Sequence, residues 1–231
     1  MKKYKYILFD LDGTLTDSGP GIMNAARYAL DSYGIKEPVE VLRTFIGPPL
    51  DKTFMERYGF TREKAFEGIA KFREYYTDKG IYENSVYEGI PELLQRLKDD
   101  GRILAIASSK PLVQVHRVLS HFDIDKYFDV VMGCELDGTR SAKDEVIEEV
   151  LRQLTTVEDK ENPLSVEFIK ENTIMIGDRS YDAVGAKKMG LPCIGVLYGY
   201  GNSKEFEDAG AEAIAETVNE LDKILLSSSP R

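Results

Sequence analysis

The stretch "YILFDLDGTLTDS", residues 6–18, decides the fold of this chain of 231 residues. Its apolar run ends in two aspartates, Asp10 and Asp12, which are separated by a single leucine. A short apolar run of this kind, closed by polar residues, is typical of a buried strand in a parallel sheet. Two neighbouring carboxylates repel each other unless a cation, a proton or a catalytic role compensates. The rest of the chain must therefore supply a partner for this pair.

Apolar runs like this first one recur along the chain, and helical patterns separate them. Together with the first run they are "YILFDL", "RILAIAS", "FDVVM", "TIMIG" and "PCIGV", and the C-terminal part has the pattern of a helix, a short strand and a helix. Parallel strands need crossover connections, which are usually helices. The alternation therefore predicts an α/β fold, a Rossmann-like parallel sheet with helices on both faces.

Residues 17–84 break this alternation. They contain no strand pattern but four helix-like stretches, of which the first is "PGIMNAARYALDSYG". Its apolar residues recur at helical spacing and form one stripe. We expect residues 17–84 to form an inserted all-α domain, and residues 1–16 and 85–231 to form the α/β core.

Composition limits the classes of partner. The formal net charge of -10 argues against nucleic acid and anionic membranes, because the sequence has no compensating basic patch. The apolar run near the N-terminus is too short for a signal peptide or a membrane span, so we expect a cytoplasmic protein. Cys134 and Cys193 lie in or beside expected strands, and we expect buried free thiols.

Ligands of an open parallel sheet bind beyond the carboxyl ends of its strands. Four carboxylates gathered there need a cation, and oxygen ligands suit a hard ion such as Mg²⁺. Zinc fits less well, because the two histidines are five residues apart on an expected helix. The scarcity of histidine also gives no support for a Ser-His-Asp nucleophile. The residues that follow the expected strands are Asp10, Asp12, Ser108, Ser109, Lys110, Asp178 and Asp182.

These motifs resemble those of the haloacid dehalogenase superfamily phosphatases. The matching features are "DLDGT" after the first strand, a serine after the second core strand, a lysine that opens a later helix, and "GDRSYD" after another strand. They occur in order over nearly the whole chain, and the inserted helices match the cap domain of that superfamily. The chain is most similar to the phosphoglycolate phosphatase-like group, and "FIGPPL" with "GVLYGYG" also resembles its 5'-nucleotidase-like branch.

The resemblance implies a role for each residue. Asp10 would attack phosphorus and form an aspartyl phosphate, and Asp12 would protonate the leaving oxygen and then activate water. Ser108 would bind the phosphoryl oxygens. Mg²⁺ would be held by Asp10, Asp178 and the backbone carbonyl of Asp12, while Asp182 would bind it through water or brace the other ligands.

Two departures from the family pattern leave the catalytic lysine open. "SSK" stands where similar proteins often have Thr-Asn-Lys, and "AKDEV" stands where they often have Lys-Pro. We prefer Lys143, which opens an expected helix, over Lys110, and we then expect Ser109 and Lys110 to contact substrate. Gly199 and Gly201 predict a turn beside the site.

The resemblance also implies a small phosphate ester as substrate, with phosphoglycolate ahead of a nucleoside monophosphate. We expect the inserted domain to select it, mainly through "RTFIGPPLDKTF", residues 43–54. A second anionic group would need a cation from Arg43, Lys52 or Arg57. A nucleobase would instead stack on Phe45 or Phe54.

Other classes of protein remain to be weighed. A sugar-phosphate mutase would retain both aspartates, and only its product would distinguish it from a phosphatase. A dehalogenase of the same superfamily would lack Asp12. A phosphorylated receiver module is shorter and has no helical insert. The sequence makes no prediction about the oligomeric state.

Overall fold

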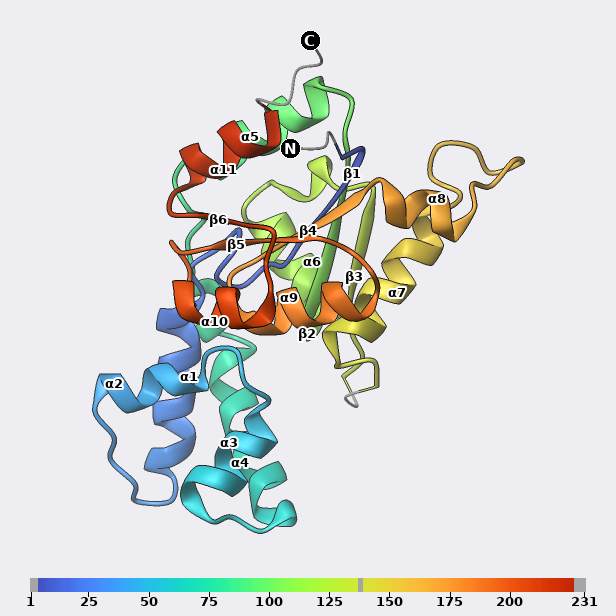
Figure 1. The fold of residues 1–231 in the computed structure, drawn as a ribbon. Coiled ribbons are helices and arrows are strands. Elements are labelled where there is room, and N and C mark those ends of the chain that lie inside the picture. The colour runs from blue at the N-terminus through green and yellow to red at the C-terminus, as the bar shows by residue number, and fades with distance from the viewer. Residues whose placement is uncertain (1–3, 137–138, 227–231) are drawn as a thin grey trace. The chain divides into compact units, whose positions relative to one another are not determined.

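The computed structural model describes residues 4–136 and 139–226. The chain divides into two compact units (Figure 1). We name Met1–Thr16 with Val86–Arg231 the α/β unit, and Asp17–Ser85 the helical unit.

The α/β unit is built on a six-stranded sheet in the order β3-β2-β1-β4-β5-β6. All neighbouring strands run parallel. The predicted α/β fold is therefore confirmed, including the short last strand. The strands are β1 (Tyr6–Phe9), β2 (Ile103–Pro111), β3 (Val130–Cys134), β4 (Thr173–Gly177), β5 (Cys193–Val196) and β6 (Ala213–Ala215).

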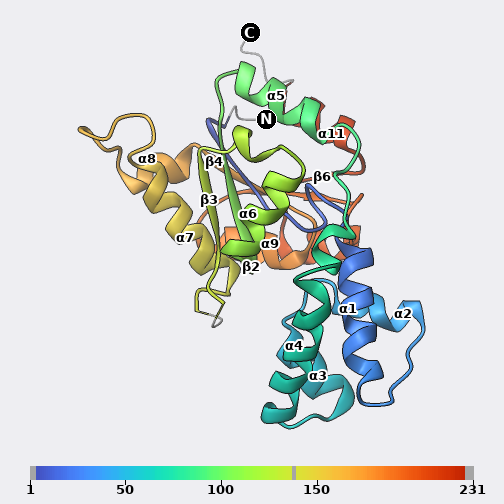
Figure 2. The same cartoon turned by 180° about the vertical axis from the view of Figure 1, so that it is seen from behind.

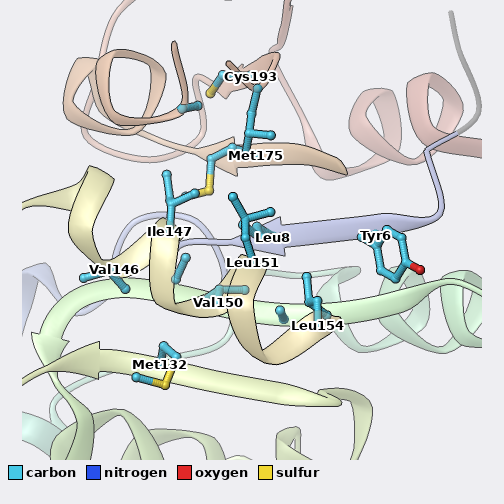
Figure 3. Packing of buried hydrophobic residues seen from close by; sticks show 14 of the residues in the cluster. Tyr6, Leu8, Met132, Val146, Ile147, Val150, Leu151, Leu154, Met175 and Cys193 are labelled. Atoms are coloured by element: carbon cyan, nitrogen blue, oxygen red, sulfur yellow. The ribbon is translucent and has the colours of Figure 1, made fainter. Parts of the chain in front are cut away.

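Helices cover both faces of this sheet (Figures 1 and 2). On one face, Tyr6 and Leu8 of β1 belong to a buried cluster with Val146, Ile147 and other residues of α7 (Figure 3). The alternate residues of β1 are equally buried, because successive side chains of a strand point to opposite faces. The helices of this unit are α5 (Ile90–Asp99), α6 (Leu112–His121), η3 (Asp125–Tyr127), α7 (Lys143–Leu154), α8 (Val166–Glu171), α9 (Ser180–Lys188), α10 (Ser203–Ala209) and α11 (Val218–Leu226).

Helix α8 was not expected from the sequence. It has only six residues, which is too short for a helical period to be recognised. Its start carries a local signal, because Ser165 accepts a hydrogen bond from the backbone N–H of Phe168 at 3.2 Å.

Strand β2 extends further than its apolar run indicates. Ala107 pairs with Met132, and the next pair along β2 joins Pro111 to Cys134, so the register of β2 against β3 shifts between Ala107 and Pro111. β2 therefore has more residues than β3 across this interval, which is the property of a bulge. The bulge contains the polar residues that follow the apolar run.

The helical unit consists of α1 (Gly19–Asp31), α2 (Val39–Leu42), η1 (Arg43–Phe45), α3 (Leu50–Tyr58), α4 (Arg62–Tyr76) and η2 (Gly80–Tyr82). Helix α1 packs against α4, and α3 also packs against α4. Aromatic rings fill the space near α3: Phe54 lies 5.4 Å from Phe45 and 5.7 Å from Phe60, measured between ring centroids. Large side chains give this small unit its core.

Cys134 and Cys193 are both buried thiols that form no disulfide within the described part of the chain, as the sequence predicts. None of the helices within residues 4–136 and 139–226 has the length and apolar character needed to cross a membrane.

Candidate active site

The carboxyl ends of β1 and β4 bring three acidic side chains together. Asp10 follows β1, while Asp178 and Asp182 lie after β4 and at the start of α9. Each offers a carboxylate oxygen, and these oxygens all lie within 4.8 Å of one another. Asp178 and Asp182 are only 1% exposed. Such a cluster requires nearby positive charge, because buried carboxylates of like sign repel.

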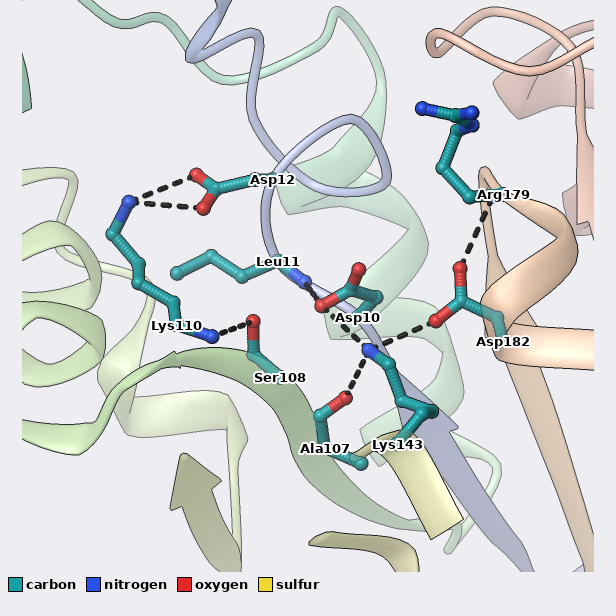
Figure 4. A network of polar contacts seen from close by, with 9 residues as sticks. All are labelled: Asp10, Leu11, Asp12, Ala107, Ser108, Lys110, Lys143, Arg179 and Asp182. Carbon is teal, nitrogen blue, oxygen red and sulfur yellow. Dashed lines mark hydrogen bonds and ion pairs between the residues drawn. The ribbon is translucent and has the colours of Figure 1, made fainter. Parts of the chain in front are cut away.

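Lys143 supplies one such charge (Figure 4). Its Nζ lies 3.1 Å from Oδ1 of Asp10 and 2.8 Å from Oδ1 of Asp182, and it donates to the backbone carbonyl of Ala107 at 2.9 Å. Burial alone would lower the pKa of Lys143, but the carboxylates of Asp10 and Asp182 raise it above its usual value. Lys143 therefore stays protonated beside Asp10.

A single lysine does not fully offset the burial of these acids. Burial raises the pKa of Asp10 to about 6, although the charge of Lys143 lowers it. Burial, followed by the negative charge of Asp182, raises the pKa of Asp178 well above its ordinary value. A second cation beside these carboxylates would favour the ionised form of both acids.

Asp178 is oriented by a glycine-rich turn. Its Oδ2 accepts a hydrogen bond from the backbone N–H of Tyr200 at 3.0 Å. A Cβ at Gly199 would lie 2.4 Å from Cβ of Asp178, and one at Gly201 would lie 2.1 Å from its backbone oxygen. The turn predicted from the sequence thus lies beside the site, and it approaches too closely to carry side chains.

The other oxygen of Asp178 is available for a ligand. Oδ1 is buried and has no hydrogen-bond partner within the described part of the chain. A buried carboxylate oxygen without a partner is costly, and a hard cation satisfies it with the oxygen ligands it prefers. The carboxylates of Asp10 and Asp178 therefore fit Mg²⁺ as ligands, and Asp182 belongs to the same acidic cluster.

Asp182 is held from two sides. In addition to its ion pair with Lys143, it accepts a hydrogen bond at Oδ2 from the backbone N–H of Arg179 at 3.1 Å. The guanidinium Nε of Arg179 in turn donates to Glu205 at 3.1 Å. Asp182 thus links the start of α9 to Lys143.

Asp12 has a separate partner in Lys110. The Nζ of Lys110 donates to Oδ1 and Oδ2 of Asp12 at 3.2 and 2.9 Å. Ser108 and Lys110 are buried, whereas Ser109 between them is exposed. A hydrogen bond from Ser108 favours the ionised form of Asp10 and lowers its pKa. The structure thus places the two candidate lysines on different carboxylates.

The expected substrate residues of the helical unit fall into two groups. Arg43 and Lys52 are exposed. Phe45 is 2% exposed and Phe54 is fully buried, and the two rings pack edge to face. Each ring therefore packs in the core of the helical unit and presents no free face in this structure, so stacking of a nucleobase on Phe45 or Phe54 stays a prediction without support from the packing.

Two glycines shape the site although the sequence assigns neither of them a role: Gly177, which is the first residue of the motif "GDRSYD", and Gly185. A Cβ at Gly177 would lie 2.2 Å from Cγ of Asp182, and one at Gly185 would lie 2.8 Å from Cβ and Cγ of Lys143. Only residues without a side chain fit at these positions unless their neighbours move. Gly177 ends a strand and Gly185 lies within a helix, so neither has the sequence signal of a turn.

The parallel sheet, the inserted helices and this acidic site define a class of protein. The model of the haloacid dehalogenase-like hydrolases matches residues 7–196, and the chain belongs to that family. It is a phosphatase-type hydrolase of phosphoric monoesters, in agreement with the resemblance seen in its motifs.

Individual relatives carry more than one name. A 5'-nucleotidase of Pseudomonas aeruginosa is 44% identical over 88% of this chain and 87% of its own. The tyrosine-protein kinase PtkA of Mycobacterium tuberculosis is 37% identical over 95% of this chain and 72% of its own. A phosphoglycolate phosphatase of Vibrio parahaemolyticus is 25% identical over 97% of both chains. The crystal structure of a predicted phosphatase from Clostridium acetobutylicum superimposes with a TM-score of 0.88 at 44% identity, over 98% of this chain and 100% of that one.

Proposed function

We propose that this chain is a Mg²⁺-dependent phosphatase that hydrolyses a small phosphate monoester through an aspartyl phosphate on Asp10. The observation that carries the proposal is the buried cluster of Asp10, Asp178 and Asp182 with Lys143 at the ends of parallel strands. Membership of a hydrolase family with phosphatase relatives supports the same reaction.

Asp10, Asp178 and the backbone carbonyl of Asp12 would hold the metal. Bound there, Mg²⁺ would offset the negative charge of the phosphoryl oxygens. We assign Asp182 to bracing, because its two oxygens already face Lys143 and the N–H of Arg179. Its orientation in turn fixes the lysine beside Asp10.

The chemistry takes place in two displacements. A carboxylate oxygen of Asp10 attacks phosphorus, the ester P–O bond breaks, and Asp12 gives a proton to the leaving oxygen. Asp12 then accepts a proton from a water that attacks the aspartyl phosphate. The bond between phosphorus and Asp10 breaks, which releases phosphate and restores the carboxylate. Ser108 and Lys143 stabilise the charge on the phosphoryl oxygens during both steps.

For the substrate, we place nucleoside 5'-monophosphates first and phosphoglycolate second. The relative named 5'-nucleotidase is 44% identical to this chain, whereas the relative named phosphoglycolate phosphatase is 25% identical. The buried rings of Phe45 and Phe54 do not support base stacking on those residues. We therefore propose that other side chains recognise the nucleoside, and that exposed Arg43 and Lys52 serve a second anionic group if the substrate has one.

A panel of phosphate esters tests this proposal. The purified chain is assayed for inorganic phosphate release from nucleoside monophosphates, phosphoglycolate, sugar phosphates and p-nitrophenyl phosphate. We expect phosphate release, fastest from a nucleoside monophosphate. Conversion of one sugar phosphate into its isomer without phosphate release would instead identify a mutase. If Arg43→Met and Lys52→Met raise KM for phosphoglycolate alone, the second anionic group is recognised as proposed.

The metal is tested on the same panel. Excess chelator should reduce phosphate release to background, and added Mg²⁺ should restore it. Ca²⁺ should support the reaction poorly, because it accepts more ligands than octahedral Mg²⁺ and can occupy both oxygens of Asp10. Full activity in excess chelator would remove Asp178 from its proposed role as a metal ligand.

A further inference from the structure

The two lysines of the site, Lys110 and Lys143, contact different carboxylates (Figure 4). Lys143 lies beside Asp10 and Asp182, whereas Lys110 donates to both carboxylate oxygens of Asp12. Asp12 is the proposed general acid and base. The proposed reaction steps give Lys110 no role, although its ammonium group contacts the Asp12 carboxylate directly.

The contact between Lys110 and Asp12 is shielded from water. The Lys110 side chain is 6% exposed and that of Asp12 is 21% exposed. Ion pairs at the surface hold their side chains weakly, whereas a largely buried lysine needs hydrogen-bonded counter-charge to offset its desolvation. Because the ammonium group contacts both oxygens, it also opposes rotation of the Asp12 carboxylate. Lys110 therefore restrains the direction in which Asp12 presents its oxygens.

Lys110 lies in the bulge of β2, and the backbone of this bulge sets the position of its side chain. The bulge in β2 follows the last regular pair at Ala107, and bulges re-aim side chains next to active sites. Within it, the N–H of Lys110 donates to Oγ of Ser108 at 3.3 Å. The backbone of the bulge passes close to Gly133 of β3. A Cβ on Gly133 would lie 2.5 Å from the backbone oxygen of Lys110 and 2.8 Å from Cα of Leu112. A glycine in the neighbouring strand thus makes room for the backbone that carries Lys110.

We propose that Lys110 is a positioning residue, which holds the carboxylate of Asp12 in the orientation needed to protonate the leaving oxygen and then to activate water. The inference rests on the proposed function, because the role exists only if Asp12 is the acid and base of a phosphatase. The competing role for Lys110 is direct contact with the substrate, as the sequence suggests. The two roles differ in how the effects of Lys110 and Asp12 combine.

A double-mutant cycle separates the two roles. The variants are Lys110→Met, Asp12→Asn and the pair, each assayed on p-nitrophenyl phosphate and on the alkyl phosphate that the parent hydrolyses fastest. Single-turnover release of the leaving group measures the first displacement. An alkyl leaving group needs protonation, whereas p-nitrophenolate needs little.

We expect Lys110→Met to lower the rate on the alkyl phosphate by about 10- to 100-fold, which is within the range of general acid catalysis, with KM nearly unchanged. On p-nitrophenyl phosphate the loss should stay below about 3-fold. Once Asp12 is asparagine, the same change should cost no more than about 2-fold further, because residues that act through each other are not additive. Lys110→Arg should recover part of the lost rate, since a guanidinium can also donate to both carboxylate oxygens.

Controls exclude a folding defect. Lys110→Met leaves Asp12 unpaired, whereas the double variant removes both charges and gives a reference without a buried unpaired charge. Lys98→Met serves as the matched control, because Lys98 also pairs with an aspartate of the α/β unit, Asp129, at 2.7 Å. It should keep the parent rates on both substrates within about 2-fold.

Three outcomes would overturn the inference. Equal losses on both substrates, which multiply with those of Asp12→Asn or raise KM, would assign Lys110 to direct substrate contact. An arginine variant no more active than the methionine variant would also count against positioning. A parent that releases no phosphate from any ester overturns the proposed function and this inference together, whereas an active parent with multiplicative losses overturns this inference alone.

Discussion

At the strand ends of the α/β unit several buried side chains are charged, whereas in the helical unit the largest buried side chains are aromatic rings. Lys143 is 7% exposed and Asp182 is 1% exposed, while Phe54 is 0% exposed. Burying charges costs free energy unless they are paired, whereas burying a ring stabilises the fold. The comparison teaches that buried charge at the strand ends indicates chemistry, whereas buried rings in the helical unit indicate packing. Substitutions in the two units should therefore fail in different ways.

The largest effect is expected at Asp10. Asp10→Asn keeps the size of the side chain but removes the anionic oxygen that attacks phosphorus, so turnover should fall by about 10⁴-fold or more. The assay is inorganic phosphate release, and thermal unfolding reports whether the fold is retained. Asp208→Asn is a matched control, because that aspartate is exposed and pairs across one helical turn with the exposed Lys204. If the Asp10 variant releases phosphate at the parent rate, the buried charges of the α/β unit do not mark its chemistry.

The next effect is expected on stability in the helical unit. Phe54→Ala should lower the free energy of unfolding by about 3–5 kcal/mol, because it removes a buried ring and leaves a cavity. The relative rates of the folded protein across the ester panel should stay unchanged. Denaturant unfolding measures the loss of stability.

A surface phenylalanine gives the control for this change. Phe168 is 48% exposed on α8, and Phe168→Ala should alter stability much less. A Phe54 variant of normal stability that selectively loses nucleotide hydrolysis would contradict its assignment to the core. It would also restore the original expectation that this ring stacks on a base.

The same contrast explains how much could be predicted from the sequence. The order of strands and helices follows from short apolar runs and amphipathic periods, and the gathering of Asp10, Asp178 and Asp182 follows from the rule for parallel strand ends. These features depend on local pattern and on one topological rule. The short helix α8 has too few residues for a period, so it was missed.

What could not be predicted depends on contacts between distant residues. Lys110 and Lys143 are both candidates for the catalytic lysine in the sequence. The bulge in β2 directs Lys110 to one carboxylate, and the start of α7 directs Lys143 to others. The ring of Phe54 has the same sequence signal whether it faces a ligand or Phe45, because composition does not report orientation. The backbone of Gly177 lies so close to the Asp182 side chain that no Cβ fits between them, and this contact depends on the tertiary fold and not on a local sequence pattern.

The smallest effects should come from two helical glycines that form a matched pair. A Cβ at Gly185 in α9 would lie 2.8 Å from Cβ and Cγ of Lys143, and a Cβ at Gly68 in α4 would lie 3.2–3.3 Å from the ring of Phe54. Each glycine thus adjoins one buried side chain, a charge in the α/β unit and a ring in the helical unit.

Alanine at these positions tests whether the two kinds of burial are distinct. The atoms of Lys143 that Gly185→Ala would crowd are close to its backbone and cannot swing away, so the ammonium group should shift and kcat should fall about 10-fold, since small misplacements in an active site are costly. Gly68→Ala should leave kcat within about 2-fold, because its contact is with a core ring. Its gain in helix propensity of up to about 1 kcal/mol offsets the tighter contact, so stability should change by less than about 1 kcal/mol. Steady-state kinetics and denaturant unfolding of both variants measure the four quantities. A tenfold loss of kcat in Gly68→Ala, or parent kcat in Gly185→Ala, would show that burial does not separate chemistry from packing in this protein.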